Sequence, residues 1–165
     1  MKLVVSADGH LTWNGGKLAC ALGRSGRRRD KVEGDGATPV GCFALKTVYY
    51  RADRLAVPAT RLPLIAIEPQ MGWCDDPSHA DYNRPVRLPH PASCETLWRD
   101  DGVYDVVVVL GHNDDPPVPG LGSAIFLHVA RPGFEPTEGC VALPLADLLA
   151  VLAECGPGDQ LVVAA

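Results

Sequence analysis

The chain has 165 residues, of which 47% are hydrophobic and 21% are charged, a composition typical of one globular domain that can bury a hydrophobic core. The net charge of −5 at pH 7 argues against a broad nucleic-acid surface, which needs an excess of lysine and arginine. No apolar run approaches the ~18 residues of a membrane span. Because the sequence contains no evident linker or repeat, residues 1–165 are interpreted as a single domain.

The first third of the chain is predicted to be β-structure. Residues 2–7 (KLVVSA) and 17–23 (KLACALG) are expected to be short strands, and the Asp-Gly and Asn-Gly-Gly pairs between them are typical of hairpin turns. The one basic cluster, residues 23–31 (GRSGRRRDK), could grip an anionic ligand, although such a run is usually a solvated loop. Residues 41–51 (GCFALKTVYYR) predict a further strand.

The middle of the chain combines an irregular stretch with an apolar one. Residues 62–69 (LPLIAIEP) are compatible with a strand, whereas residues 70–100 show no clear periodicity. A long irregular segment in a compact domain is often functional, and the aromatic residues within it indicate order, so we interpret it as a binding loop. Residues 103–113 (VYDVVVVLGHN) are nearly all apolar and predict a central buried strand, with residues 123–129 (SAIFLHV) as its neighbour.

The C-terminal region contains the one clear helical pattern. Apolar residues at 145, 148, 149 and 152 have the spacing of an amphipathic helix over residues 144–155 (PLADLLAVLAEC), which the following GPG would stop. Residues 160–165 (QLVVAA) close the chain as a strand. The sequence therefore predicts a mainly β domain with one α-helix in its C-terminal region.

Six cysteines bear on the cellular location. They stand at positions 20, 42, 74, 94, 140 and 155. The N-terminal residues MKLVVSADGHL lack the ~7–15 apolar residues of a secretion signal, so we expect a cytoplasmic protein whose thiols are reduced. A periplasmic location, with disulfides possible, is expected instead if the native chain carries a signal that has been trimmed away.

A histidine and a cysteine stand at the two ends of one loop. An apolar run ends on His128, and a segment broken by Pro and Gly leads to Cys140, directly after Gly139. A thiol becomes a useful nucleophile beside an imidazole, and a glycine before it frees backbone N–H groups for an oxyanion. The spacing alone does not show whether His128 and Cys140 are catalytic, because buried cysteines and histidines at strand ends are also common as purely structural residues.

The sequence around these two residues resembles the L,D-transpeptidase (YkuD-type) catalytic domain. That family has an apolar strand ending in His, followed by Ser/Thr-x-Gly-Cys and an apolar residue; here these segments are AIFLHVA and TEGCVAL. An upstream TPxGxF segment is present as ATPVGCF at residues 37–43. The resemblance covers roughly residues 35–155, and it implies a β-sandwich or barrel-like mixed sheet with a cleft.

The resemblance also implies a mechanism. Cys140 would be the nucleophile and His128 the general base and then acid, with the imidazole oriented by a backbone carbonyl near Val129. Amides around Gly139 and Cys140 would form the oxyanion hole. The implied substrate is a peptidoglycan stem peptide: the thiol attacks the L,D bond before the terminal D-Ala, D-Ala leaves, and a thioester remains. No cofactor is expected.

Three departures from the family pattern affect substrate binding. Many members have His before the Gly-Cys pair, where this chain has Glu138, and many have Arg or Asn at the position of Ala142. The loop between His and Cys is also shorter than usual. Arg131 could replace the missing arginine as the partner of a substrate carboxylate, or be a surface residue. Glu138 could contact a substrate amine or the imidazolium, or face solvent.

The acceptor of the acyl group decides the name of the reaction. Water gives an L,D-carboxypeptidase, and an amine gives an L,D-transpeptidase that cross-links or exchanges D-amino acids. Because we expect a cytoplasmic location, we favour water, with soluble muropeptides from wall turnover as substrate. A non-catalytic wall-peptide binding module and an unrelated cysteine peptidase or amidase are the alternatives; in an enzyme, Cys140 should react with a thiol reagent faster than the other five cysteines.

Residues 72–89 (GWCDDPSHADYNRPVRLP) are expected to form one wall of the substrate cleft. Trp73 and Tyr82 would supply an apolar face, and Asn83 and Arg84 hydrogen-bond donors. The overlapping array of Cys74, His79, His90 and Cys94 has ligand types that suit zinc. Its spacing matches no standard structural zinc site, however, so the sequence assigns no metal.

Overall fold

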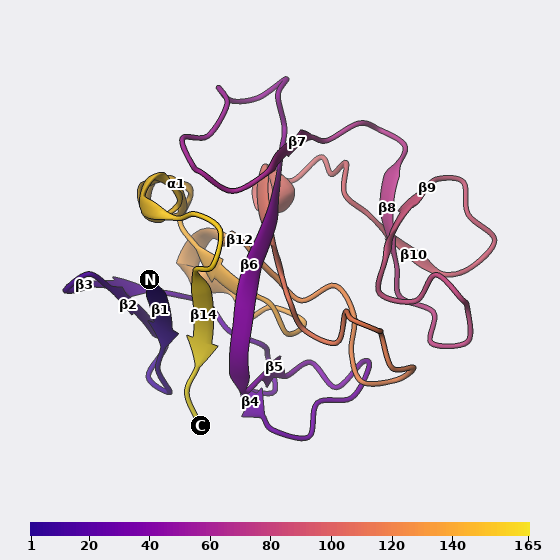
Figure 1. The fold of residues 1–165 in the computed structure, drawn as a ribbon, viewed down its shortest axis with the longest axis horizontal. Coiled ribbons are helices and arrows are strands. Elements are labelled where there is room, and N and C mark those ends of the chain that lie inside the picture. The colour runs from indigo at the N-terminus through magenta and orange to yellow at the C-terminus, as the bar shows by residue number, and fades with distance from the viewer.

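Strands dominate the computed structural model, which describes residues 1–165 (Figure 1). The strands are β1 (Lys2–Val5), β2 (His10–Trp13), β3 (Gly16–Ala19), β4 (Arg27–Arg28), β5 (Thr38–Pro39), β6 (Gly41–Tyr50), β7 (Leu64–Ala66), β8 (Met71–Cys74), β9 (Pro85–Arg87), β10 (Cys94–Thr96), β11 (Val106–Leu110), β12 (Phe126–Val129), β13 (Val141–Leu143) and β14 (Gln160–Val163). The helices are the short 3-10 turns η1 (Gly102–Tyr104) and η2 (Pro132–Phe134) and the α-helix α1 (Leu145–Glu154). No helix is long and apolar enough to cross a membrane.

The main sheet is mixed and closes almost into a barrel. Its strand order is β13-β12-β11-β6-β14-β1-β2-β3, with β7 paired to β6. Just beyond β3, Ala21 forms an antiparallel bridge to Ala142 of β13, with N–H···O distances of 2.8 and 3.0 Å in the two directions. The two ends of the strand order therefore meet, which confirms the expected barrel-like mixed sheet.

Two hydrophobic cores lie on the two faces of β11, whose five residues are all buried. Val106, Val108 and Leu110 pack into the larger core inside the barrel. Val107 and Val109 face the other way, into a smaller core that includes residues of β8 and η1. A strand covered on both faces is apolar at every position, as the sequence of residues 103–113 predicts.

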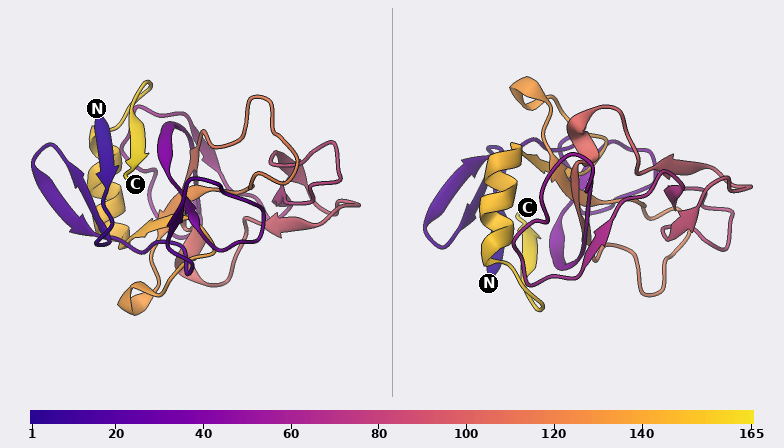
Figure 2. Two further views of the ribbon diagram at one scale, coloured as in Figure 1. Left: turned by 90° about the horizontal axis from the view of Figure 1, so that it is seen from below. Right: turned by 90° about the horizontal axis from the view of Figure 1, so that it is seen from above.

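The helix α1 packs its apolar side against the larger core. Leu148, Val151 and Leu152 are fully buried there, and Leu145 and Leu149 are partly buried against the same core. Pro144 is the N-cap, and the helix ends before Cys155. Both views in Figure 2 place α1 at one end of the molecule and the strands β8–β10 at the opposite end.

The N-terminal segment contains one more strand than expected. The Asp-Gly and Asn-Gly-Gly pairs lie in two separate turns, and between them β2 pairs antiparallel with both β1 and β3. The alternation of β2 places Leu11 in the core with no exposed surface. The predicted strands at residues 2–7 and 17–23 appear in shorter form as β1 and β3.

Residues 70–100 are also more regular than the sequence indicates. They form a three-stranded antiparallel sheet in the order β10-β8-β9. Because each of its strands has only three or four residues, the segment shows no sequence periodicity, and the prediction of an irregular loop is wrong. The strands predicted at 41–51, 62–69, 123–129 and 160–165 are present with shorter bounds.

Candidate active site

Cys140 and His128 both line one cleft of about 450 Å³. A hollow of this size suits a small peptide or another drug-sized ligand. Acidic and basic side chains together surround the two residues. The charged lining residues are Lys31, Glu33, Asp75, Glu95, Arg99, Arg131, Glu135 and Glu138.

Neighbouring strands place the thiol and the imidazole on the same face of the main sheet. In the parallel pair β12–β13, Leu127 lies opposite Val141 and His128 opposite Ala142. Cys140 therefore lies beside Phe126, whose N–H is 3.3 Å from its Sγ. Because side chains alternate along a strand, His128 points to the same side as Phe126 and so to the side of the thiol.

The imidazole of His128 is held in one tautomer. Its Nδ1 lies 2.9 Å from the Val129 carbonyl oxygen, as the resemblance implied. A carbonyl only accepts, so Nδ1 carries the hydrogen and Nε2 keeps the lone pair that can take a proton. The Tyr104 ring packs edge-on against the imidazole, with ring centres 5.4 Å apart. Burial lowers the pKa of His128 to about 4, so the ring is neutral at pH 7.

The thiol of Cys140 is protected in this structure. Its Sγ lies 3.3 Å from the Ala124 carbonyl oxygen, to which it donates, and no hydrogen bond joins it to His128. Burial, and then the negative charge of Glu95, raise the pKa of Cys140 to about 12. Cys140 is only 7% exposed, whereas Cys42 is exposed. The burial and the raised pKa favour slow reaction of Cys140 with a thiol reagent in the free protein, the opposite of the order expected from the sequence.

The turn before Cys140 requires a glycine. Gly139 has φ +137°, and a Cβ there would lie 2.8 Å from the Ala37 carbonyl oxygen. The Thr137 hydroxyl donates to the Cys140 carbonyl at 2.6 Å and accepts from the Gly139 N–H at 3.1 Å. Ala37 begins the ATPVGCF segment, so one role of that segment is to support the cysteine loop from behind.

One backbone donor near the thiol is free. The Gly139 N–H is engaged by Thr137, whereas the Cys140 N–H donates to no protein group. Of the two amides expected to form an oxyanion hole, only that of Cys140 is therefore ready to bind an oxyanion without breaking an existing hydrogen bond.

The two predicted charged residues, Arg131 and Glu138, both line the cleft. The Arg131 guanidinium is about half exposed and lies 3.4 Å from Asp101, while Glu138 pairs with Arg24 at 2.9 Å on the surface. Ala142 is fully buried on β13 opposite His128 and also lines the cleft. Arg131 and Ala142 thus line the same cleft.

The four residues predicted to form a cleft wall do not line this cleft. The Trp73 Nε1–H donates to the Asn83 side-chain oxygen at 2.9 Å, and the Asn83 amide donates to the His112 and Asn113 carbonyls. The Tyr82 hydroxyl donates to Glu33 at 2.8 Å. Arg84 is exposed elsewhere. The polar groups of Trp73, Tyr82 and Asn83 thus form hydrogen bonds within the protein.

Four residues of the cleft lining were not singled out from the sequence: Tyr104, Glu95, Arg99 and Asp75. Tyr104 packs on His128 and donates its hydroxyl to the buried carboxyl of Glu95, whose pKa burial raises. The Arg99 guanidinium lies 5.2 Å from the Tyr104 ring centre and forms two hydrogen bonds to Asp101. Asp75 has a buried Oδ1 without a hydrogen-bond partner beside the same cleft. For Arg99 and Tyr104 the sequence signal is the segment WRDDGVYD, in which charged residues lie next to an aromatic one; Asp75 lies in the segment expected to form a cleft wall.

The Cys74, His79, His90 and Cys94 array is partly assembled. Ligand atoms of Cys74, His90 and Cys94 lie within 4.8 Å of one another, as do those of His79, Asp81 and His90. All six cysteines of the chain are free thiols.

Comparisons with known proteins identify the family. The family model of the L,D-transpeptidase catalytic domain (YkuD) matches residues 1–163. Among solved structures, an L,D-transpeptidase from Mycobacterium smegmatis is similar, with 15% identity, a TM-score of 0.48 and coverage of 99% of this chain and 58% of that chain. The helical cell shape determining protein Pgp2 from Campylobacter jejuni has 13% identity, a TM-score of 0.44 and coverage of 98% of this chain and 46% of that chain.

The chain thus spans about half the length of these two proteins. No curated protein sequence matches. Since the family model covers nearly all residues, the chain belongs to the L,D-transpeptidase catalytic domain family.

Proposed function

From this family membership and the cleft, we propose that the protein catalyses cysteine-dependent acyl transfer on peptidoglycan stem peptides. It cleaves the L,D bond before the terminal D-Ala. The observation that carries the proposal is that Cys140 and His128 line one cleft while the Val129 carbonyl fixes the tautomer that leaves Nε2 free to take a proton.

The resting protonation states define the first step. The thiol and the imidazole are both neutral, so Nε2 of His128 takes the proton as Sγ of Cys140 attacks the substrate carbonyl carbon. The carbonyl oxygen gains negative charge, which the free Cys140 N–H stabilises. The imidazolium then gives its proton to the leaving D-Ala nitrogen, the C–N bond breaks, and a thioester to Cys140 remains.

The cleft has charged groups for both ends of such a substrate. Arg99 and Arg131 lie on the side of His128 and lower the pKa of its ring, so a substrate carboxylate is favoured there. Asp75 and Glu95 supply carboxyl groups elsewhere in the lining, and the unpartnered Oδ1 of Asp75 suits an ammonium group. A stem peptide that contains a diamino acid offers both charges.

We propose water as the acceptor, which makes the protein an L,D-carboxypeptidase that trims soluble muropeptides. Water needs no second binding site: His128, neutral again after D-Ala leaves, can take a proton from the water that attacks the thioester. Amine transfer is a second candidate, because a hollow of about 300 Å³ adjoins the cleft through Val103, Arg131 and Glu135. The carboxylates of Asp101 and Glu135 in that hollow suit an incoming amine.

The test uses a purified disaccharide tetrapeptide with and without a second D-amino acid, followed by mass spectrometry. Loss of D-Ala to give a tripeptide supports hydrolysis, and incorporation of the added D-amino acid supports transfer to an amine. An unchanged tetrapeptide that still binds would overturn the enzymatic proposal in favour of a binding module. Cleavage at another bond would indicate a different peptidase or amidase.

Two cysteine variants provide matched controls for this assay. Cys140→Ala should abolish turnover with the fold retained, as judged by circular dichroism. Cys42→Ser removes an exposed thiol that is not part of the cleft lining and should leave turnover unchanged. An intact-mass adduct on the wild type, absent from Cys140→Ala, would identify the thioester.

A further inference from the structure

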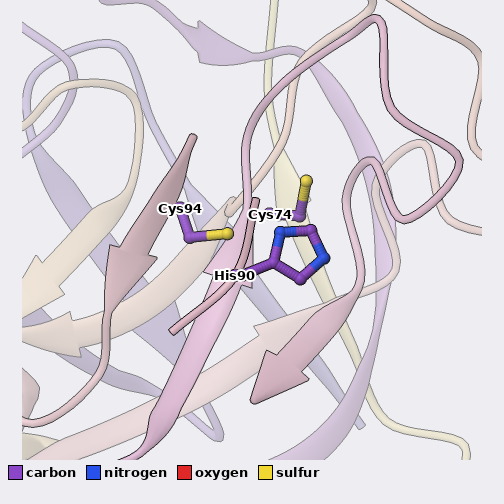
Figure 3. A group of neighbouring side chains, drawn as sticks. All are labelled: Cys74, His90 and Cys94. Atoms are coloured by element: carbon purple, nitrogen blue, oxygen red, sulfur yellow. The ribbon is translucent and has the colours of Figure 1, made fainter. Parts of the chain in front are cut away.

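A second group of chemically reactive side chains lies outside the cleft, on the β8–β10 sheet. In the antiparallel pair β10–β8, Cys94 lies directly opposite Cys74. His90 comes from the loop that leads into β10, and its ring turns toward the two sulfur atoms (Figure 3). One ligand atom from each of the three residues lies within 4.8 Å of the other two.

The imidazole of His90 is held in place from its far side. Its Nε2 lies 2.9 Å from a carboxylate oxygen of Asp81, and the His79 ring packs edge-on with ring centres 4.8 Å apart. A carboxylate only accepts, so Nε2 carries the hydrogen and Nδ1 keeps its lone pair. That lone pair accepts from the Ala92 N–H at 3.1 Å. A carboxylate that orients a histidine in this way is the usual support of a metal-bound imidazole.

We propose that Cys74, Cys94 and His90 bind a zinc ion, with Asp81 as the positioning residue for His90 and solvent as the fourth ligand. Two thiolates and one imidazole form a soft donor set that selects zinc over magnesium or calcium. Binding releases the two thiol protons to solvent, and Nδ1 exchanges its contact with Ala92 for the ion.

The position of these residues in the fold suits a site that fastens strands together. The β8–β10 sheet has strands of only three or four residues, and a bound ion would link β8, β10 and the loop between β9 and β10. Cys74 is fully buried, His90 is nearly buried and Cys94 is half-buried, so the ion would be largely shielded from water.

Such an ion would also support the cleft. The residues next to the two cysteines point to the opposite face of the same strands, where Trp73 packs on Phe126 and Glu95 accepts from the Tyr104 hydroxyl. Tyr104 in turn packs on His128. The zinc therefore fixes one face of the β8–β10 sheet, whose other face contacts Tyr104, the residue that packs on the proposed base. The zinc proposal itself does not depend on the proposed activity.

The direct test is metal content and affinity of the purified protein under reducing conditions. We expect one zinc per chain, and cobalt(II) should give the intense near-ultraviolet absorption of a thiolate-to-cobalt transition. Saturating zinc should raise the thermal midpoint by roughly 5–10 °C, the shift given by a ligand at about a hundred times its Kd in a domain of this size.

Variants separate the site from general effects on folding. Cys94→Ser and His90→Ala should each weaken zinc binding by ~100-fold or more, and Asp81→Ala by about tenfold or more. Cys42→Ser, which removes an exposed cysteine outside the group, should bind like the wild type. Circular dichroism without metal shows whether each variant is folded.

Three results would overturn the proposal. The first is a wild-type protein that takes up neither zinc nor cobalt although its thiols are reduced. The second is equal metal affinity in the wild type and a folded Cys94→Ser variant, which would place the metal elsewhere. The third is a Cys74–Cys94 disulfide in the native protein, found by non-reducing peptide mapping.

Discussion

The reactivity of Cys140 in the free protein is the sharpest consequence of the cleft geometry. Its thiol is buried and donates to the Ala124 carbonyl, and its pKa is raised from an ordinary 9.0 to about 12. The perturbation to apply is pH, from 6 to 10, with iodoacetamide as the reagent. Because the thiolate is the reactive form, Cys140 should alkylate slowly throughout this range.

The size of the effect follows from the pKa. At pH 8 a thiol of pKa about 12 is ionised to roughly one part in ten thousand, against about one part in ten for a pKa of 9.0. The higher pKa makes each thiolate more nucleophilic and recovers about a factor of 20, given a Brønsted coefficient of about 0.45. We therefore expect alkylation about fiftyfold slower than that of an ordinary thiol, and slower still because the side chain is buried.

The assay follows each cysteine separately by peptide mass spectrometry. Exposed Cys42 should label first. The logarithm of the Cys140 rate should rise by about one for each pH unit up to pH 10, with no plateau. A plateau near neutral pH, with a rate like that of Cys42, would refute the reasoning, because it would mean that Cys140 and His128 already form a thiolate–imidazolium pair.

Three further predictions concern the residues around the pair. The pKa of His128 falls from 6.5 in the unfolded chain to about 4 in the folded protein, because burial disfavours the charged ring. The contribution of His128 to the free energy of unfolding is therefore fully present above pH 6.5, and about 3 kcal/mol of it is lost as the pH falls toward 4. Urea unfolding of His128→Asn should lack this part of the decline. Gly139→Ala should destabilise the fold by about 1–3 kcal/mol and lower turnover at least tenfold, whereas Gly133→Ala, where a Cβ meets nothing within 4 Å, should show only the backbone strain in calorimetry and normal turnover. Arg131→Ala should lower kcat/KM for the tetrapeptide about tenfold, since the guanidinium is half exposed, and an unchanged value would assign the substrate carboxylate to Arg99.

The parts of the fold that the sequence predicts are those set by local pattern. The buried strand at residues 106–110 and the helix at 145–154 follow from a continuous apolar run and from helical spacing. The strand β2 was not recognised because the turns on either side of it lie only a few residues apart, and β8–β10 were not recognised because strands of three or four residues have no measurable period. The closure at Ala21 and Ala142 depends on backbone groups far apart in the chain, which no local signal reveals.

In the candidate site, too, some residues have a local sequence signal and others are brought in from distant parts of the chain. Cys140, His128 and the Val129 carbonyl are encoded within one loop and its flanking strands, so their motif is readable. Tyr104 reaches His128 from η1, and Glu95 reaches Tyr104 from the separate β8–β10 sheet, so neither contact has a local sequence signal. Trp73 and Asn83 were expected to contact substrate because of their polar groups, whereas the fold leaves them out of the cleft lining and pairs the Trp73 Nε1–H with the Asn83 side-chain oxygen.

The position of β14 in the sheet determines at what stage of folding the active-site cleft can form. The C-terminal strand lies in the middle of the main sheet, parallel to β1 and antiparallel to β6, and so joins the N-terminal hairpin to the rest. Until residues 160–163 have left the ribosome, β1–β3 have no partner on that side, and Ala21 has no fixed path to Ala142. Contacts between segments this distant form late and slowly. The cysteine loop is therefore assembled only once residues 160–163 are available, and removal of β14 should leave a chain that collapses without a cleft.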